Sequence, residues 1–215
     1  MNPLILLALL WLAYFAIHSL CAGLGLKRQV AARWPRLLSA YRLLFNLQAV
    51  VLILPPLWLT WSYDGPWLWR WEGAWAWLAN GLALLAAAGF VWSLRWYDSG
   101  EFLGLLQWRR GQQEVEDLER LHLSPLHRHV RHPWYFLGLV ILWTRDMNAA
   151  WLLTGVMASA YLWVGSWLEE RKLLLYHGEA YRRYLKRVPG LLPWPGRSLS
   201  PQEAAELEAL ARNGR

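Results

Sequence analysis

Long apolar runs constrain the fold of this chain more than any other feature. A helix that crosses a bilayer needs about 20 consecutive apolar residues. Of the 215 residues, 56% are hydrophobic and only 17% are charged, which is a poor match to a soluble domain of this size. We therefore predict an all-α integral membrane protein with about five transmembrane helices. The expected spans cover residues 3–24, 41–61, 74–96, 133–144 and 149–168.

The last two spans are separated by a short polar break. The span at 133–144 is too short for an ordinary crossing, so we expect it to be thin, tilted or only partly inserted. The break Thr144–Asn148 lets the chain turn back, which predicts a C-terminal helical hairpin. In the second span, Pro55 and Pro56 cannot donate to the helix ladder and predict a kink. Many of the 18 tryptophans fall near the ends of apolar runs, as in an aromatic belt.

The positive charges predict the orientation in the membrane. Of the 22 Lys and Arg residues, 20 fall in the segments 27–42, 95–131 and 171–215, and the alternate connections hold only Arg70 and Arg145. By the positive-inside rule the rich segments are cytoplasmic, with the N-terminus outside and the C-terminus inside. Because the basic residues gather at one membrane face, we interpret the net charge of +7 as a topology signal and predict no nucleic-acid partner.

Two polar clusters flank the hairpin, and its turn would bring them to the same membrane face. Arg131 can bind a carboxylate with two hydrogen bonds, and His132 can donate or accept a proton near neutral pH. Glu169 or Glu170 can accept hydrogen bonds from sugar hydroxyls or an ammonium. Nearby tyrosine rings offer faces to a cation or an aromatic base. A zwitterion such as S-adenosylmethionine would use all of these groups. The candidate cofactor-binding residues are Arg131, His132, Tyr135, Glu169, Glu170, Tyr181 and Tyr184.

Each of these residues taken alone also fits a structural role. Arg131 is typical of a positive-inside flank, and Glu169–Glu170 beside Arg171–Lys172 is typical of a charged helix end. The combination and its spacing favour the ligand interpretation. A soluble nucleotide-binding fingerprint is missing from the sequence. One cysteine permits neither an intramolecular disulfide nor a cysteine zinc cluster, and we predict no metal.

The C-terminal part carries a family pattern. The pattern reads RHPxY, then EE with a following leucine, then GxxYxxY and VPxxP. It matches at Arg131, His132, Pro133, Tyr135, Glu169, Glu170, Leu173, Gly178, Tyr181, Tyr184, Val188, Pro189 and Pro193. The chain thus resembles the isoprenylcysteine carboxyl methyltransferase and phospholipid methyltransferase superfamily. Upstream, a DxxxFxGLxQ stretch is similar to the bacterial methanethiol S-methyltransferase-like branch. It is formed by Asp98, Phe102, Gly104, Leu105 and Gln107, with weaker support from His18–Ser19 and Tyr41–Leu43.

The resemblance implies an S-adenosylmethionine-dependent methyltransferase in a bacterial inner membrane. It places the donor on the cytoplasmic side and implies that an apolar or amphipathic acceptor arrives from the bilayer. The acceptor would be a small thiol, a lipid or a prenylated compound. A thiol would benefit from a nearby base or cation that favours the thiolate. Candidates for this catalytic role are Arg109, Arg128 and His129.

Two functions of other kinds stay open. One is a non-catalytic membrane protein that binds a small molecule or assists assembly on the same scaffold. The other is a reductase, which would need a longer chain and a nicotinamide site.

We predict a single domain over residues 1–215 with four parts. The three N-terminal spans cover 1–96, a cytoplasmic loop 97–132, the hairpin and cofactor signature 133–195, and a tail 196–215. In the loop, residues 114–122 predict a short surface helix. After the fifth span, the helix should continue to Tyr176 and end at His177–Gly178. In the tail, a capping pattern at residues 200–203 predicts an amphipathic helix to Ala211, which we expect to be a solvated appendage.

The positive-inside interpretation can be tested with topology reporters. We expect fusions at Gly65 and Gly196 to report opposite sides of the membrane, because the connection around Gly65 holds little positive charge and the C-terminal segment holds much. A periplasm-active and a cytoplasm-active reporter at each site would give complementary signals. Finding both positions on one side would contradict the five-span arrangement.

Overall fold

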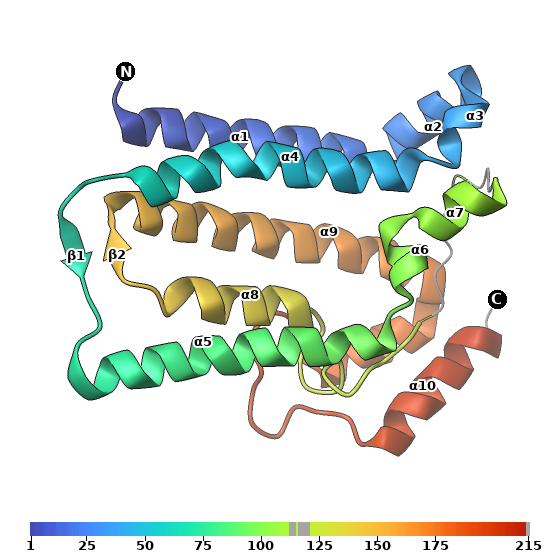
Figure 1. Cartoon of the computed structure of the whole chain (residues 1–215). Coiled ribbons are helices and arrows are strands. Elements are labelled where there is room, and N and C mark those ends of the chain that lie inside the picture. Colours follow the sequence, from blue (N-terminus) through green and yellow to red (C-terminus); the bar gives the residue numbers. More distant parts are fainter. Residues whose placement is uncertain (112–114, 116–120, 214–215) are drawn as a thin grey trace. The chain divides into compact units, whose positions relative to one another are not determined.

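The computed structural model describes residues 1–111, 115 and 121–213. Helices dominate the described residues, and four of them are long and apolar enough to cross a membrane (Figure 1). These are α1 (Pro3–Ala22), α4 (Tyr41–Ser62), α5 (Gly73–Ser93) and α9 (Ala149–Arg187). The apolar helix α8 (Pro133–Trp143) has only 11 residues, as expected for the short fourth span. The all-α membrane fold is confirmed.

Shorter elements complete the two compact units into which the chain divides. They are α2 (Leu24–Arg33), α3 (Pro35–Leu38), β1 (Trp67–Trp69), η1 (Leu94–Trp96), α6 (Ser99–Leu103), α7 (Leu105–Arg110), β2 (Met147–Asn148) and α10 (Pro201–Asn213). Unit 1 comprises Met1–Arg70, Tyr97–Asp117 and Asp146–Met157, and unit 2 comprises Trp71–Trp96, Leu118–Arg145 and Ala158–Arg215. Most of the surface helix predicted at 114–122 lies outside the described residues. The single-domain organisation stays a prediction.

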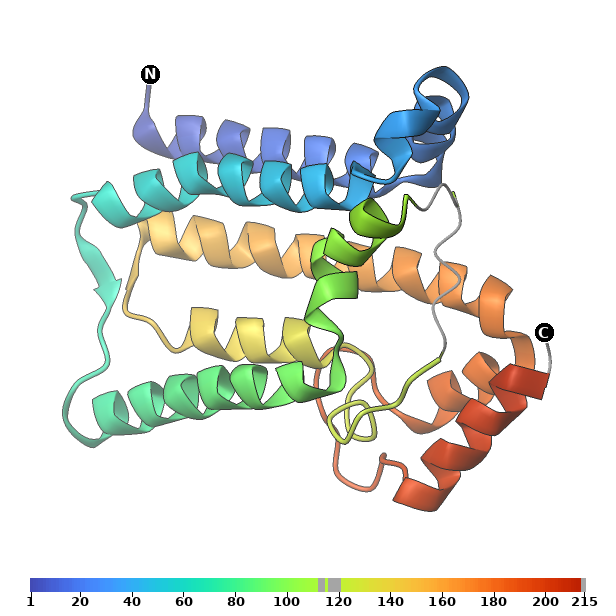
Figure 2. The same cartoon turned by 45° about the vertical axis from the view of Figure 1, so that its right-hand side comes forward.

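In unit 1, α1 lies along α4 (Figures 1 and 2). Their shared core contains Leu7 and Trp11 of α1 together with Ala150 from the first turn of α9. Leu7 and Ala150 are fully buried, while much of the remaining helix surface is exposed leucine, valine and tryptophan. Exposed apolar surface of this kind is expected where lipid rather than water surrounds a helix.

A chain of buried hydrogen bonds joins the same three helices. The Trp11 indole Nε1 donates to Thr154 Oγ1 at 3.0 Å, and the hydroxyls of Thr154 and Thr60 lie 2.7 Å apart. Thr60 Oγ1 also donates to the carbonyl of Pro56 at 2.8 Å. Polar links of this kind hold membrane helices together where apolar side chains gain nothing over lipid.

The turn between α6 and α7 presses closely on the start of α4. Gly104 has φ of 87°, and a Cβ there would come within 2.6 Å of the Leu43 backbone nitrogen. The carbonyl of Phe102 accepts hydrogen bonds from Arg42 Nε at 3.2 Å and Asn46 Nδ2 at 3.0 Å. A glycine is therefore required at residue 104 for two reasons, the left-handed backbone and the close approach. The two segments that carry the branch resemblance contact each other here.

Unit 1 contains a small antiparallel strand pair that the sequence analysis did not predict. It joins the segment after α4 to the segment before α9. Strand β1 pairs with β2, with Trp67 opposite Asn148 and Trp69 opposite Met147. The Asn148 side chain accepts from the Trp151 amide at 2.9 Å and so caps the first turn of α9. The polar residues between α8 and α9 therefore form an ordered turn, held by the strand pair and the Asn148 cap.

In unit 2, α5 packs along α8 (Figures 1 and 2). The Trp134 indole Nε1 donates to Ser93 Oγ at 2.8 Å, and the Trp134 ring lies 4.9 Å from that of Phe90. Gly89 faces Leu137, whose Cδ2 would be 3.5 Å from an added Cβ. The short helix α8 is therefore held from its first turns by an aromatic contact and a buried hydrogen bond.

Helix α9 breaks where the sequence predicts. Gly178 has φ of 50° and ψ of −122° inside the helical run, a backbone conformation that glycine adopts readily. The residues after it return to form a core with the tail. That buried core contains Leu123, Tyr181, Tyr184, Val188, Leu199, Ala204 and Leu207.

The tail helix α10 is part of this core, so the expected solvated appendage is wrong. Ala204, Leu207 and Ala211 share one face and are buried. The Leu123 amide donates to Glu208 Oε1 at 2.6 Å, which adds a polar link across the interface. The reciprocal capping box is confirmed, because the Ser200 amide donates to Glu203 Oε2 and the Glu203 amide donates to Ser200 Oγ. An amphipathic pattern predicts a buried face but cannot distinguish docking from solvation.

The Trp11–Thr154–Thr60 chain gives a stability prediction. We expect Thr154→Val to lower the free energy of unfolding by about 1–2 kcal/mol, because it leaves the Trp11 indole and the Thr60 hydroxyl without this shared partner. Unfolding in mixed detergent micelles, followed by circular dichroism, measures the change. Thr144→Val is the matched control, since the hydrogen bonds given for the Thr144 hydroxyl are local. It donates to the carbonyls of Val140 and Ile141 in its own helix turn and accepts from Nη2 of the adjacent Arg145 at 3.4 Å. Equal losses in the two variants would contradict a role for the interhelical chain.

Candidate functional site

The start of α8 is fastened to the segment after α9 by backbone hydrogen bonds. Pro133 occupies the first helical position, where its missing N–H costs nothing, and His132 is the N-cap residue. The Arg131 amide donates to the Pro189 carbonyl at 2.9 Å, and the His132 amide donates to the Gly190 carbonyl at 3.2 Å. The segments Arg131–Pro133 and Val188–Gly190 are therefore held together by backbone hydrogen bonds within unit 2.

The Arg131 side chain extends this attachment. Its Nε donates to Glu170 Oε1 at 2.8 Å, and its Nη1 donates to the carbonyls of Leu185 (3.2 Å) and Val188. The guanidinium thus ties α8, the middle of α9 and the end of α9 together. Its side chain is 14% exposed and that of Glu170 is 15% exposed, so the ion pair is shielded from water. We call Arg131, His132 and Glu170 the clasp.

The His132 imidazole lies between two carboxylates. Its Nε2 is 2.9 Å from Glu170 Oε1, and its Nδ1 is 3.4 Å from Glu169 Oε2. The ring also stacks on Tyr135, with centroids 5.2 Å apart and planes 9° from parallel. Tyr135 in turn donates its hydroxyl to Glu169 Oε2 at 3.3 Å. The structure therefore brings five of the seven predicted cofactor-binding residues together: Arg131, His132, Tyr135, Glu169 and Glu170.

The two neighbouring glutamates have different surroundings. Glu170 is mostly buried, and its Oε1 accepts from both Arg131 and His132. Glu169 is 47% exposed, and its contacts with His132 and Tyr135 are longer, at 3.4 and 3.3 Å. Glu170 is thus committed to the clasp, whereas Glu169 presents a carboxylate that can accept further hydrogen bonds.

The other two predicted cofactor-binding residues have buried rings. Tyr181 and Tyr184 are each 2% exposed and contact each other in the core that includes α10, with ring centroids 5.6 Å apart. The Tyr184 hydroxyl donates to the carbonyl of His127 at 2.7 Å. In the structure these rings support the loop before the clasp.

The three candidate catalytic residues are not brought together within one unit. Arg109 lies in the last turn of α7, in unit 1. Arg128 and His129 lie in the loop that leads to the clasp, in unit 2, and His129 is exposed. The Arg128 carbonyl accepts from the Leu199 amide at 2.9 Å, which fixes this loop against the segment before α10.

Sequence reasoning missed two contributors to the site. His127 Nδ1 lies 2.8 Å from the hydroxyl of Ser124, a fully buried residue of the same loop. Gly190 supplies a carbonyl to His132, and a Cβ at this residue would lie 3.1 Å from Arg131 Nη2. The sequence signal for Gly190 was its place inside the VPxxP pattern. His127 carried no spacing signal, because its role depends on the loop conformation.

Burial and neighbouring charges shift the two histidines in opposite directions. Burial lowers the pKa of His132, but hydrogen bonds and charges from Glu169 and Glu170 outweigh burial and raise it above its ordinary value. Both ring nitrogens then face carboxylates, which suits the doubly protonated imidazolium. Burial, together with the charges of His122 and His132, lowers the pKa of His127 to about 4, so this ring is neutral at physiological pH.

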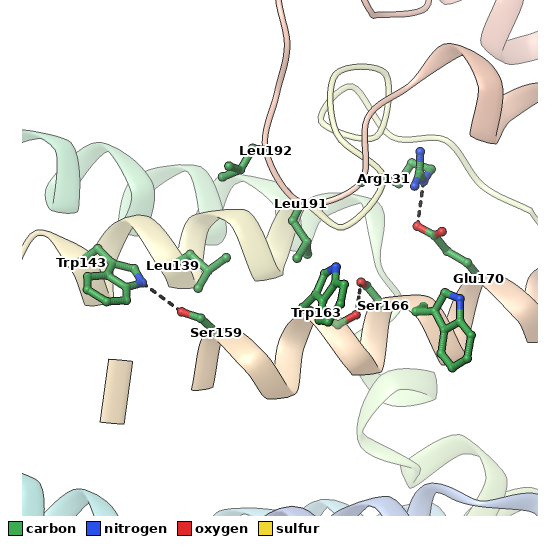
Figure 3. Close-up of a pocket in the computed structure, with 11 residues that line it drawn as sticks. Arg131, Leu139, Trp143, Ser159, Trp163, Ser166, Glu170, Leu191 and Leu192 are labelled. Carbon is green, nitrogen blue, oxygen red and sulfur yellow. Dashed lines mark hydrogen bonds and ion pairs between the residues drawn. The ribbon is translucent and has the colours of Figure 1, made fainter. Parts of the chain in front are cut away.

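A groove with a volume of about 630 Å³ runs along unit 2 next to the clasp (Figure 3). Arg131 and Glu170 lie at one end, and Trp143 lies toward the other. Its walls come from α8, α9 and the segment after α9. The lining residues besides these three are Leu139, Ser159, Trp163, Ser166, Trp167, Gly190, Leu191 and Leu192. The volume falls within the usual range for small-molecule sites, about 300–1,000 Å³.

Comparison with known proteins finds relatives that share one name. A methanethiol S-methyltransferase of Pseudomonas sp. is 31% identical over 202 residues, which cover 86% of this chain and 72% of that protein. Methanethiol S-methyltransferase 2 of Bradyrhizobium diazoefficiens is 32% identical, with 88% of this chain and 73% of that protein covered. The enzyme of Mycobacterium tuberculosis is 41% identical over 102 residues, covering 45% of this chain and 41% of that protein.

The chain belongs to the methanethiol S-methyltransferase family. The predicted resemblance is therefore confirmed, and the names of these relatives indicate a methyltransferase. The family assignment rests on these curated relatives. No protein-family model matches the chain, and no solved structure matches it.

The lowered pKa of His127 gives a prediction about stability and pH. Above pH 6.5 the ring is neutral in both folded and unfolded chains. As the pH falls from 6.5 to about 4, the unfolded chain takes up the proton more readily, so the free energy of unfolding decreases. The loss has an upper limit of about 3 kcal/mol. We expect His127→Asn, which keeps a polar group near Ser124, to reduce this acid-induced loss.

Thermal unfolding in detergent at pH 8 and pH 4.5 measures the difference. The matched control is His129→Asn, which changes an exposed histidine of the same loop. An unchanged acid-induced loss in His127→Asn would show that other groups cause it.

Proposed function

We propose that this protein is an S-adenosylmethionine-dependent methyltransferase of a bacterial inner membrane that methylates a small thiol on sulfur. The observation that carries the proposal is the convergence of Arg131, His132, Tyr135, Glu169 and Glu170. Family membership supports the reaction type, and the substrate in the names of these relatives supports a thiol acceptor over a lipid or a prenylated compound.

The residues of the site fit this donor. Glu169 offers a half-exposed carboxylate, which suits an ammonium, a sulfonium or ribose hydroxyls. The stacked ring of Tyr135 provides an aromatic surface beside it, which also suits a cation. Arg131 and Glu170 are occupied by each other and by backbone carbonyls. We therefore assign Glu169, His132 and Tyr135 to the donor and assign Arg131 and Glu170 mainly to holding these groups in place.

The protein need supply little acid–base chemistry. When bound, S-adenosylmethionine supplies a methyl group on a sulfonium, whose sulfur keeps the bonding electron pair when the methyl leaves. The acceptor thiol loses its proton to water, and the thiolate lone pair forms the new sulfur–carbon bond. The products are a methyl thioether and S-adenosylhomocysteine. Alignment of the two sulfur atoms with the methyl carbon is the main requirement, so binding geometry decides the rate.

Cationic side chains would favour the thiolate form of the acceptor. Arg128 and His129 precede the clasp in the same loop of unit 2, and Arg109 ends α7 in unit 1. We keep these three as candidates for the catalytic role. His127 is a poor candidate for the base, because its pKa of about 4 is far below that of a thiol, ordinarily about 8.5. The orientation with a cytoplasmic clasp follows from the distribution of Lys and Arg.

The different surroundings of the two glutamates predict different binding defects. We expect Glu169→Gln to weaken S-adenosylmethionine binding about 10- to 100-fold, because a charge-assisted contact is worth about 1.5–3 kcal/mol. If Glu169 faces the sulfonium, binding of S-adenosylhomocysteine, which lacks that charge, should change much less. Glu170→Gln should weaken both ligands together, because it loosens the clasp. Isothermal titration calorimetry on purified protein in detergent measures both affinities.

Glu179→Gln is the matched control. Glu179 belongs to the same helix, is 50% exposed and pairs with Arg182 and Arg183 away from the site. Lack of binding by the wild-type protein would contradict the proposed donor. Wild-type affinity in both Glu169→Gln and Glu170→Gln would mean that these residues are only a charged helix end.

A further inference from the structure

Away from the clasp, the groove walls are mostly apolar, and their serine hydroxyls already have hydrogen-bond partners. The Trp143 indole Nε1 donates to Ser159 Oγ at 3.0 Å (Figure 3). The Ser166 hydroxyl donates to the carbonyl of Trp163 at 2.8 Å. Both serine hydroxyls in the groove are therefore already engaged. Apart from Arg131, Glu170 and Gly190 at one end, the rest of the wall is leucine and tryptophan. A chain of methylenes or an aromatic ring fits such a surface without leaving a buried polar group unsatisfied.

The Arg131 end of the groove has a different character. Among the hydrogen bonds of the described residues, Arg131 uses Nε and Nη1, and none uses Nη2. Nη2 points to the side of Gly190, where an added Cβ would lie 3.1 Å from it. Gly190 and Arg131 both line the groove. The missing side chain at residue 190 therefore leaves space beside a guanidinium nitrogen that can still donate.

We propose that this groove binds the methyl acceptor, with the thiolate sulfur at Arg131 Nη2 and an apolar substituent along the α8–α9 wall. The inference rests on the proposed function and specifies its substrate class as thiols with an alkyl or aryl chain longer than a methyl group. A guanidinium favours a thiolate over a thiol. Glu170 offsets part of the Arg131 charge through the ion pair at Nε, so the preference for the thiolate rests on the hydrogen bond that Nη2 can donate to it.

The length of the groove distinguishes this acceptor from methanethiol. A volume of about 630 Å³ is far more than one thiol carrying a methyl group fills. Each methylene that is fully buried gains up to about fourfold in affinity. An acceptor held at its sulfur by Arg131 and extending toward Trp143 would gain from each added methylene until the groove is full.

A series of acceptors tests the proposal. Methanethiol, 1-propanethiol, 1-butanethiol and 1-hexanethiol are assayed with labelled S-adenosylmethionine and the full-length protein in nanodiscs. We expect kcat/KM to rise with chain length by up to about fourfold per methylene and then to level off. A flat or falling series with intact methanethiol methylation would overturn the groove assignment and leave the proposed function standing. A bilayer acyl chain as the true occupant would give this same flat series. No methylation of any thiol would overturn the proposed function itself.

Partition of long thiols into the bilayer also raises their local concentration, so variants must separate this effect from binding. Leu139→Trp fills the groove and should flatten the series while methanethiol turnover persists. Leu191→Trp makes the same change from a non-helical segment, in case the helical variant does not fold. Leu175→Trp is the matched control, because Leu175 is 85% exposed and does not line the groove. A rise that survives in both groove variants would assign the effect to partition and overturn the proposal.

The placement of the thiolate at Arg131 Nη2 is tested by adding one methyl group at residue 190. Gly190→Ala should lower kcat/KM at least tenfold for all the thiols, because its Cβ crowds Nη2, and this loss should exceed any loss of calorimetric affinity for S-adenosylmethionine. Gly165→Ala in α9 is the control, since an added Cβ there meets nothing within 4 Å. Unchanged thiol turnover in Gly190→Ala would overturn the placement of the thiolate at Arg131.

Discussion

The partly buried Arg131–Glu170 ion pair is the interaction on which the functional site of unit 2 depends. One guanidinium binds a carboxylate of α9 and two carbonyls at the end of the same helix, while the adjoining backbone binds Pro189 and Gly190. Taking both charges out of water carries a desolvation cost, which the added hydrogen bonds offset. Removal of either partner would leave an uncompensated charge at the junction of three chain segments. The position of His132 between the two glutamates follows from this attachment.

The helical hairpin explains how the residues of the clasp meet. Apolar spans bring the start of α8 and the middle of α9 to one face, because the polar turn after α8 reverses the chain. The side chains of Arg131 and Glu170 then lie 2.8 Å apart and are only 14% and 15% exposed. In a lipid bilayer, the hydrophobic effect does not drive helices together. In unit 1, the Trp11–Thr154–Thr60 hydrogen bonds supply directional contacts between helices instead.

The sequence predicted those features that are local or periodic. Apolar runs located the spans closely, and Gly178 and the Ser200–Glu203 capping pattern located a helix break and a helix start. The meeting of the RHP and EE clusters was predicted because the turn leaves few alternatives. Features that depend on tertiary packing were missed. A sequence does not reveal that Tyr181 and Tyr184 face a core completed by α10, or that Arg131 is bound by backbone carbonyls.

The different roles of Glu169 and Glu170 follow from the helical geometry of α9. Consecutive residues of a helix point about 100° apart. Glu170 therefore faces Arg131 and the groove, as do Trp163, Ser166 and Trp167, while Glu169 faces Tyr135. His132 contacts both carboxylates and so connects the two faces. If the donor binds on the Glu169 face and the thiol on the groove face, a change of charge at either site acts on the same imidazole. The raised pKa of His132 favours the imidazolium, whose charge would act on both carboxylates beside Arg131, so the two sites would be coupled by electrostatics as well as by position.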